Sequence, residues 1–439
     1  MTCVLALQNL ITFAVNLADN VMIGGYSQTA MSGVAIVNQI QFLLQMLMLG
    51  TGAAIGVLGS QYWGKKELIP VRKATSIGLL LGVILSAIMM LLVYFFPRQA
   101  LGLLTNEQTV IDEGAKYLSI ICFSYVLFAV SQNLLSALRS VETVRIGFVV
   151  NLVALVVNVV LNYGLIYGRL GMPEMGVRGA AIATLSARVV EFIVVVVYVL
   201  FFDKKICWRP KNLLRLDRTM LRDYIRVGTP LILANGIWGI AMSVQTAILG
   251  RMGDDTIAAN SIATTIFQVV SVVCYAASTA SAVVIGKTVG EGDIPRVKAY
   301  TKSLQIMYIG IGIVTGLTLY SCSDLIIRLY DVTPAAAQLA KQFIMVLSVS
   351  VVGTSYQCSC LTGIVTGGGD TKFVLINDLI HQWLIVIPSA FLSAFVFQWP
   401  LWVTFMCLKS DQILKCFVAV VKVNRYKWIR KLTRDNAEK

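Results

Sequence analysis

Charged residues are scarce in this sequence. Asp, Glu, Lys and Arg make up 13% of the 439 residues, whereas hydrophobic residues make up 57% and the mean hydropathy is +0.78. A soluble chain of this length would fold as two or three domains with charged surfaces, and the composition excludes that class. It is typical of a protein that crosses a membrane many times.

Histidine is scarcer still, because His381 is the only one. The sequence also contains no C-x-x-C pair, zinc-ligand spacing, nucleophile elbow, Walker loop or glycine-rich dinucleotide turn. We therefore expect no enzyme activity and no cofactor, and a membrane-embedded enzyme is only a remote alternative. Without a nucleotide-binding loop, an ion gradient is the expected energy source. Residues 367–370, Gly-Gly-Gly-Asp, are interpreted as a tight turn capped by Asp370.

Long apolar runs, in contrast, are abundant. About 20 apolar residues in a helix cross a hydrocarbon core of about 30 Å. Such runs lie near residues 2–23, 33–59, 74–96, 117–138, 146–168, 178–202, 230–250, 260–286, 303–321, 342–365, 373–397 and 400–421. Because helices satisfy their own backbone hydrogen bonds in lipid, we predict an all-α integral membrane fold with twelve transmembrane helices.

Positive charges gather on one side of these predicted spans. Of the 36 Lys and Arg residues, 26 lie in one set of alternate connections and the C-terminal tail, and 7 lie in the other connections. Connections rich in Lys and Arg face the cytoplasm, so both termini are expected there. The same pattern accounts for the net charge of +14, and nucleic acid is not expected as a partner.

The chain contains an internal repeat of six spans. Residues 59–67, Gly-Ser-Gln-Tyr-Trp-Gly-Lys-Lys-Glu, correspond to residues 285–293, Ile-Gly-Lys-Thr-Val-Gly-Glu-Gly-Asp, at a shift of 226 that aligns Gly64 with Gly290. An even number of spans gives both halves the same polarity. We therefore predict two six-helix lobes related by pseudo-two-fold symmetry about the membrane normal. Duplication for packing alone would leave the same repeat, and this alternative stays open.

The repeat also sets the predicted domain boundaries. The N-terminal lobe covers residues 1–202, a basic cytoplasmic linker 203–226, the C-terminal lobe 227–421 and a basic cytoplasmic tail 422–439. In the linker, helical spacing predicts an interfacial helix against anionic lipid headgroups. The basic residues with this spacing are Arg215, Arg218, Arg222 and Arg226.

One acid, Asp19, lies inside the first span. A charged group at the bilayer centre costs roughly 2.5–3.5 kcal/mol, so Asp19 is a candidate functional residue. Asn158 and Asn162, at i, i+4 in the fifth span, and Thr184 in the sixth lie at a matching depth. A carboxylate with neutral oxygens suits a hard cation, and a buried carboxylate can instead hold a proton. We predict a cation site at these four residues, with helix packing by the amides as the alternative.

Charged residues also gather in the last two spans. Asp378 and His381 lie in the eleventh span, and Lys409 and Asp411 lie in the twelfth. They form either a second protonatable site or a self-compensating cluster, in which Asp378 pairs with Lys409 and Asp411 pairs with Lys415.

Four segments together resemble the prokaryotic branch of the multidrug and toxic compound extrusion family. They are residues 19–24 (Asp-Asn-Val-Met-Ile-Gly), 61–66 (Gln-Tyr-Trp-Gly-Lys-Lys), 158–167 and 285–291 (Ile-Gly-Lys-Thr-Val-Gly-Glu). The resemblance covers essentially the whole chain. It implies a multi-pass antiporter of the bacterial cytoplasmic membrane that exports amphipathic, often cationic organic compounds in exchange for Na⁺ or H⁺ as two lobes alternate.

The resemblance also implies which residues bind the ion. It carries a cation site, Na⁺ included, over to Asp19, Asn158 and Thr184. Several members hold a second aspartate where this chain has Asn162, and others hold a glutamate where it has Trp238. The choice between Na⁺ and H⁺ therefore stays open, and a second-lobe cation site of that type is not expected. We expect a monomer whose partners are small organic cations and membrane lipids.

A flippase for lipid-linked or polysaccharide substrates is the main alternative. Such a protein would need arginines in its cleft to hold a diphosphate. In the interior of the predicted spans the only arginine is Arg188, since Arg178 stands at the end of its span. We interpret Arg188 as a structural i, i+3 partner of Glu191, and Lys409 and Lys415 lie near acids.

Overall fold

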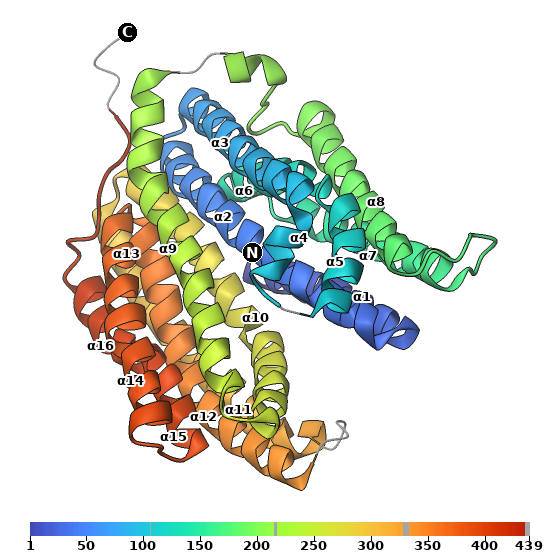
Figure 1. Ribbon diagram of the computed structural model, residues 1–439. Coiled ribbons are helices and arrows are strands. Elements are labelled where there is room, and N and C mark those ends of the chain that lie inside the picture. Colours follow the sequence, from blue (N-terminus) through green and yellow to red (C-terminus); the bar gives the residue numbers. More distant parts are fainter. Residues whose placement is uncertain (106, 215–216, 328–332, 435–439) are drawn as a thin grey trace. The chain divides into compact units, whose positions relative to one another are not determined.

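The computed structural model describes residues 1–439 except 106, 215–216, 328–332 and 435–439. The described residues form helices and connections, without a strand (Figure 1). Within this described part of the chain, ten helices are long and apolar enough to cross a membrane, or eleven if one bent pair counts as a span. The chain divides into two compact units.

The first unit comprises Met1, Cys3–Gly59 and Glu67–Ile232. Its core contains fully buried side chains such as Val37, Leu118 and Ala129. Its helices are α1 (Thr2–Tyr26), α2 (Gln28–Gly64), α3 (Leu68–Phe95), α4 (Pro97–Gly102), α5 (Gln108–Ile121), α6 (Ser124–Ser140), α7 (Arg145–Tyr167), α8 (Gly176–Val197) and the first part of α9 (Arg218–Gly250).

The fourth predicted span, 117–138, is not one straight helix. It is formed by α5 and α6, which meet at a bend of 55°. At the bend, the hydroxyl of Ser124 donates to the carbonyl of Ile121 at 2.6 Å. A side chain that competes for a backbone acceptor in this way weakens the regular helix ladder, which the apolar pattern does not reveal.

The second unit comprises Ser60–Lys66 and Leu233–Lys439. In its core the rings of Phe343 and Phe405 stack with centroids 4.1 Å apart. Besides the last part of α9, its helices are α10 (Asp254–Glu291), α11 (Ile294–Ile327), α12 (Pro334–Cys358), α13 (Thr371–Leu379), α14 (Ile387–Phe391), α15 (Leu401–Leu408) and α16 (Asp411–Asn424), with π-helical segments η3 (Ser359–Val365), η4 (Ile380–Val386) and η5 (Leu392–Val396).

The twelfth predicted span, 400–421, is divided between α15 and α16. The break falls at Lys409 and Ser410, and α16 begins at Asp411. The charged residues that the sequence places inside this run therefore coincide with the interruption, so the prediction of a single continuous helix here was wrong.

The basic linker also differs from the prediction. Residues 203–209 are not helical, Pro210–Leu214 form a short 3-10 helix, and α9 begins at Arg218. Arg218, Arg222 and Arg226 thus belong to the first turns of α9 rather than to a separate interfacial helix, while Arg215 lies outside the described residues.

Asp217 fixes the start of α9. Its carboxylate accepts from Lys73 Nζ at 2.8 Å and from the backbone N–H of Thr219 at 2.9 Å. The hydrogen bond from Lys73, followed by that from Thr219, lowers the pKa of Asp217. A carboxylate with a lowered folded pKa contributes stability above its unfolded pKa near 3.9 and loses it as the pH falls through the folded value.

We expect Asp217→Asn to lower the unfolding free energy slightly at pH 7, by less than about 1 kcal/mol because the pair is exposed. Thermal unfolding compared at pH 7 and below pH 3 checks this, and the difference from the unaltered protein should vanish at the lower pH. If the two proteins still differed in stability by the same amount below pH 3, the ion pair of Asp217 with Lys73 would not be the source of the difference.

The repeat found in the sequence has a structural counterpart. A Cβ atom added to Gly64 would overlap the carbonyl of Lys287, and one added to Gly290 would overlap the carbonyl of Gln61. Gly64 and Gly290 are equivalent at the shift of 226, as are Gln61 and Lys287, so the contact is reciprocal. This close approach explains why both repeats keep glycine there.

The Gly-Gly-Gly-Asp turn receives the C-terminal tail. The indole of Trp428 is fully buried, and a Cβ atom on Gly368 would overlap its ring. The N–H of Arg430 donates to the carbonyl of Gly368 at 2.8 Å. Asp370 is the N-cap residue of α13, but its side chain makes no capping hydrogen bond and instead pairs with Lys422 at 2.8 Å and Arg430 at 3.0 Å. The turn at residues 367–370 is therefore the site where the C-terminal tail packs, and we call it the seat of the tail.

We expect Gly368→Ala to lower the unfolding free energy by about 1–3 kcal/mol, because the added methyl group meets a rigid buried ring. Thermal unfolding of the purified protein measures this. Gly310→Ala is the control, since no atom lies within 4 Å of a Cβ there. Equal stability of the two variants would contradict the seat.

Candidate cation site in the first unit

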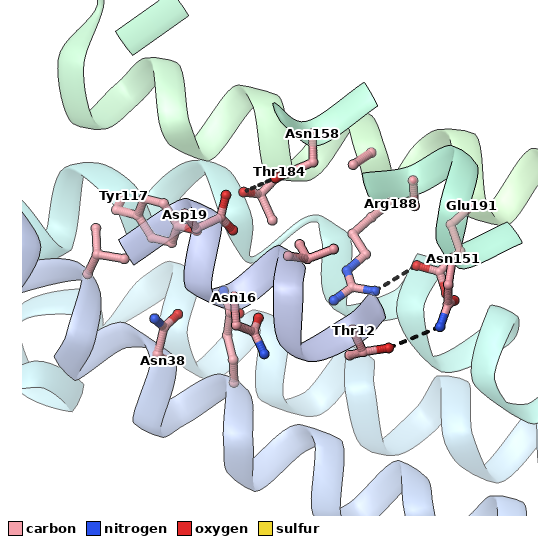
Figure 2. Close-up of a pocket in the computed structure, with 15 residues that line it drawn as sticks. Thr12, Asn16, Asp19, Asn38, Tyr117, Asn151, Asn158, Thr184, Arg188 and Glu191 are labelled. Carbon is pink, nitrogen blue, oxygen red and sulfur yellow. Dashed lines mark hydrogen bonds and ion pairs between the residues drawn. The ribbon is translucent and has the colours of Figure 1, made fainter. Parts of the chain in front are cut away.

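The four residues predicted for the cation site come together. Asn162 Nδ2 donates to Asp19 Oδ1 and, at 3.2 Å, to Asn158 Oδ1. Asn158 Nδ2 in turn donates to Thr184 Oγ1 at 3.3 Å. All four side chains are buried, and together they link α1, α7 and α8. Figure 2 shows three of them, Asp19, Asn158 and Thr184.

Helix geometry explains this convergence. Asn158 and Asn162 are one turn apart on α7, so their side chains share a face. The phenol of Tyr167 on the same helix donates to the carbonyl of Met22 on α1 at 2.6 Å. At the other end, Asn151 Nδ2 donates to Thr12 Oγ1 at 3.0 Å. Two polar contacts, one beyond each end of the site, therefore hold α7 against α1.

One acceptor at the site has no donor. Asn162 Oδ1 is buried without a hydrogen-bond partner among the described residues. A buried acceptor left unsatisfied costs about 1–3 kcal/mol, so a group that bonds it is favoured. Na⁺ accepts carboxylate, amide and hydroxyl oxygens as ligands, and a proton on Asp19 would need an acceptor of this kind. The donor set thus fits either ion.

Asp19, Asn158 and Thr184 line a small cavity, whereas Asn162 does not. The volume of the cavity is about 50 Å³, enough for a bare ion or one or two waters, whereas sites for drug-sized molecules measure about 300–1,000 Å³. Its polar lining consists of Thr12, Asn16, Asp19, Asn38, Gln41, Tyr117, Asn151, Asn158, Thr184, Arg188 and Glu191. The cavity therefore has the size of an ion or water site and is smaller than sites for drug-sized molecules.

Several lining residues were not predicted from the sequence. Asn38 and Gln41 on α2, Tyr117 on α5 and Asn16 on α1 all line the cavity. The signal that marks them is a polar residue inside an apolar run, which was used for Asp19 but not for these amides. Tyr117 lies in α5, one turn before the bend between α5 and α6.

The predicted pair of Arg188 and Glu191 forms, with Arg188 Nη1 2.6 Å from Glu191 Oε2. Both residues line the same cavity as Asp19. The guanidinium also lies over the ring of Phe128, 4.8 Å from its centroid. The pair is thus a neighbour of the candidate site as well as a link within α8.

The charged cluster of the second unit is only partly the predicted one. Lys415 Nζ lies 2.9 Å from Asp378 Oδ1 and 3.3 Å from Asp411 Oδ2, so one lysine serves two acids. The predicted pair of Asp378 with Lys409 is wrong, because Lys409 instead lies over the ring of Phe405 at 5.7 Å. The interruption between α15 and α16 separates the two lysines.

Amides extend this cluster. Asp411 Oδ2 also accepts from Gln382 and Gln412, both at 2.9 Å, and Gln245 donates to Gln382 at 3.1 Å. His381 bonds the carbonyl of Asn377 in its own helix at 2.8 Å. Gln382 lies in the π-helical segment η4, which shifts the side chains by part of a turn. Asp378 and Asp411 share one lysine, so the cluster keeps one uncompensated negative charge, and the charge-balanced pairing expected from the sequence does not form. Its ion pairs and hydrogen bonds nevertheless join α9, α13, η4 and α16, as expected of a structural lock.

Known proteins resemble this chain over almost its whole length. The chain is 25% identical to the probable multidrug resistance protein NorM of Thermotoga maritima, over 98% of this chain and 93% of that protein. It is also 25% identical to the probable multidrug resistance protein NorM of Listeria monocytogenes, over 96% of this chain and 92% of that protein.

Solved structures share the fold. A mutant of the Vibrio cholerae MATE transporter VcmN superposes with a TM-score of 0.88 at 17% identity, over 98% of this chain and 96% of that one. The straight conformation of a MATE transporter superposes with a TM-score of 0.87 at 16% identity, over 97% of this chain and 94% of that one. The all-α membrane fold predicted from the sequence is therefore confirmed.

The family follows from the sequence match. The MatE family model matches residues 5–164 and 230–392, one segment in each predicted lobe. Its members are transporters rather than enzymes, as the missing catalytic motifs predicted. With both repeats matched, this chain belongs to the MatE family, the multidrug and toxic compound extrusion transporters.

Proposed function

We propose that this protein is a secondary antiporter that exports amphipathic, often cationic organic compounds and takes up one coupling ion, Na⁺ or H⁺, at Asp19. The observation that supports the ion site most is the buried Asp19 in contact with Asn162, whose own carbonyl oxygen has no donor among the described residues. NorM relatives described as probable multidrug resistance proteins support the substrate class.

In this proposal the ion neutralises Asp19. Na⁺ would bind the carboxylate with Asn162 Oδ1 and Thr184 Oγ1, whereas a proton on Asp19 would be donated to Asn162 Oδ1. Either ion satisfies the same oxygen, so the geometry fits both. An ion can drive transport only if it binds one conformation more tightly than the other, since differential affinity alone shifts an equilibrium.

The cellular setting is part of the proposal. The bias of Lys and Arg toward one set of connections supports a place in the bacterial cytoplasmic membrane with both termini in the cytoplasm. The basic start of α9, with Arg218, Arg222 and Arg226, would then face anionic headgroups.

Efflux from liposomes under imposed gradients tests the proposal. Purified protein is reconstituted with ethidium as the transported probe, under an inward Na⁺ gradient in one set and an inward pH gradient in another. We expect one of the two gradients to accelerate ethidium transport over protein-free liposomes. Equal rates with and without both gradients would contradict cation-coupled export.

A further inference from the structure

The cavity at Asp19 carries a net negative charge of one. Its charged lining residues are Asp19 from α1 and Arg188 and Glu191 from α8. The other elements contribute neutral groups, which are Asn38 and Gln41 from α2, Tyr117 from α5 and the amides of α7. Two acids and one base leave one charge uncompensated.

The placement of Arg188 and Glu191 ties them to Asp19. Arg188 lies one helical turn after Thr184, which bonds Asn158 of the site. Figure 2 shows Asp19 and Arg188 directed into the same cavity from α1 and α8. Glu191 is almost fully buried, with 1% of its side chain exposed, and is held by Arg188 and by Gln132 at 3.5 Å.

Arg188 and Glu191 border the candidate ion site and also contact α6. The two residues are three positions apart on α8, while Gln132 of α6 donates to Glu191 at 3.5 Å and Arg188 lies 4.8 Å from the ring centroid of Phe128 on α6. A neutral amide at position 191 could also accept the hydrogen bond from Gln132. The full charges of Arg188 and Glu191 matter for what lies beside them, because charges act over longer distances in a water-poor interior than in water.

We infer that Arg188 and Glu191 are positioning residues that hold the cavity at a charge of −1, so that it takes one monovalent cation per transport cycle. This inference rests on the proposed function. One Na⁺ or one H⁺ makes the cavity neutral, whereas a divalent ion or a second monovalent ion leaves an uncompensated positive charge in the interior, which is costly. The pair therefore fixes both the charge class and the number of the coupling ion.

Cation binding to the purified full-length protein tests this without any organic substrate. Equilibrium binding of ²²Na⁺ gives the affinity and the number of Na⁺ ions per chain. Infrared difference titration of the carboxyl band that disappears in Asp19→Asn gives the affinity for the proton. Four variants are compared with the unaltered protein: R188Q, R188K, E191Q and the double variant R188Q/E191Q.

The expected changes have opposite signs. R188Q gives the cavity a charge of −2 and should bind the cation about tenfold more tightly. E191Q makes the cavity neutral and should bind the cation about tenfold more weakly. A factor of this size corresponds to one charge acting over roughly 10 Å at an effective dielectric constant near 20. R188Q/E191Q restores −1 and should bind within about threefold of the unaltered protein, as should R188K. The stoichiometry should be one ion per chain.

Two results would overturn the inference and leave the pair structural. One is a change of cation affinity in the same direction in R188Q and E191Q. The other is a cation affinity of the double variant that differs from that of the unaltered protein by more than the affinity of E191Q does. R188Q leaves Glu191 buried without its partner and is the variant most at risk of misfolding. E191Q and R188Q/E191Q contain no buried acid at position 191, so their cation affinities test the inference even if R188Q misfolds. An unaltered protein that binds neither Na⁺ nor a proton at Asp19 would contradict the proposed function instead.

Discussion

Replacing Asp19 by Asn should reduce ion-driven export of ethidium by about tenfold or more. Coupling between two ligands commonly corresponds to factors of about 5–150, and the substitution would remove the charge that the coupling ion neutralises. Asparagine keeps the size of the side chain and can still bond Asn162. The measurement is ethidium efflux from pump-deficient cells, with the amount of each variant in the membrane determined in parallel.

Asp112→Asn is the matched control. Asp112 belongs to the same unit, but it lies at the surface, where it pairs with Arg98 at 2.9 Å. Export should persist in this variant. If Asp19→Asn, present at normal amounts, exported ethidium as well as Asp112→Asn does, Asp19 would have no part in coupling.

Lys415→Met should be the most destabilising single substitution in the second unit. It leaves Asp378 and Asp411 without their shared lysine, and breaking a buried ion pair by removing one partner costs about 3–5 kcal/mol. Asp411 and Lys415 have 2% and 4% of their side chains exposed, so water cannot replace the lost partner. Thermal unfolding in detergent and the yield of folded protein measure the loss.

Lys341→Met provides the same substitution at the surface. Lys341 pairs with Asp324 at 2.7 Å, with more than half of each side chain exposed. Its loss should cost no more than about 1 kcal/mol. A triple variant, Asp378→Asn with Lys415→Met and Asp411→Asn, removes all three charges and should recover part of the stability. Equal effects of the two lysine substitutions would contradict a structural lock.

The sequence predicted the convergence of the four polar residues because its signal is local. An acid inside an apolar run, two amides one turn apart and a hydroxyl at equal depth are each visible in one dimension, and helix geometry brings the amides to one face. Asn38 and Gln41 carry the same signal. Their place in the cavity lining was not predicted from the sequence. An amide that lines a cavity and an amide that packs against a helix look the same in the sequence, and only the arrangement of α2 beside α1 distinguishes them.

The errors lie at breaks in helices and at contacts between segments distant along the chain. The bend at Ser124 coincides with a hydrogen bond from its side chain to the backbone, and the interruption at Lys409 coincides with charged residues, but a window of hydropathy predicts neither break. Asp378 was paired with the wrong lysine because i, i+4 spacing ranks partners within a helix and not between two helices. The seat of the tail at Gly368 depends on Trp428, which is distant along the chain, and no local pattern joins the two.

Coupled cation flux is the most direct test of Asp19 as the ion site. Liposomes loaded for ethidium transport are monitored for ethidium and, at the same time, for uptake of the driving cation, with ²²Na⁺ or a pH-sensitive dye. The unaltered protein should move both in fixed proportion, and Asp19→Asn should lose the cation flux together with export. Cation uptake that stays coupled to ethidium transport in Asp19→Asn would show that the ion binds elsewhere.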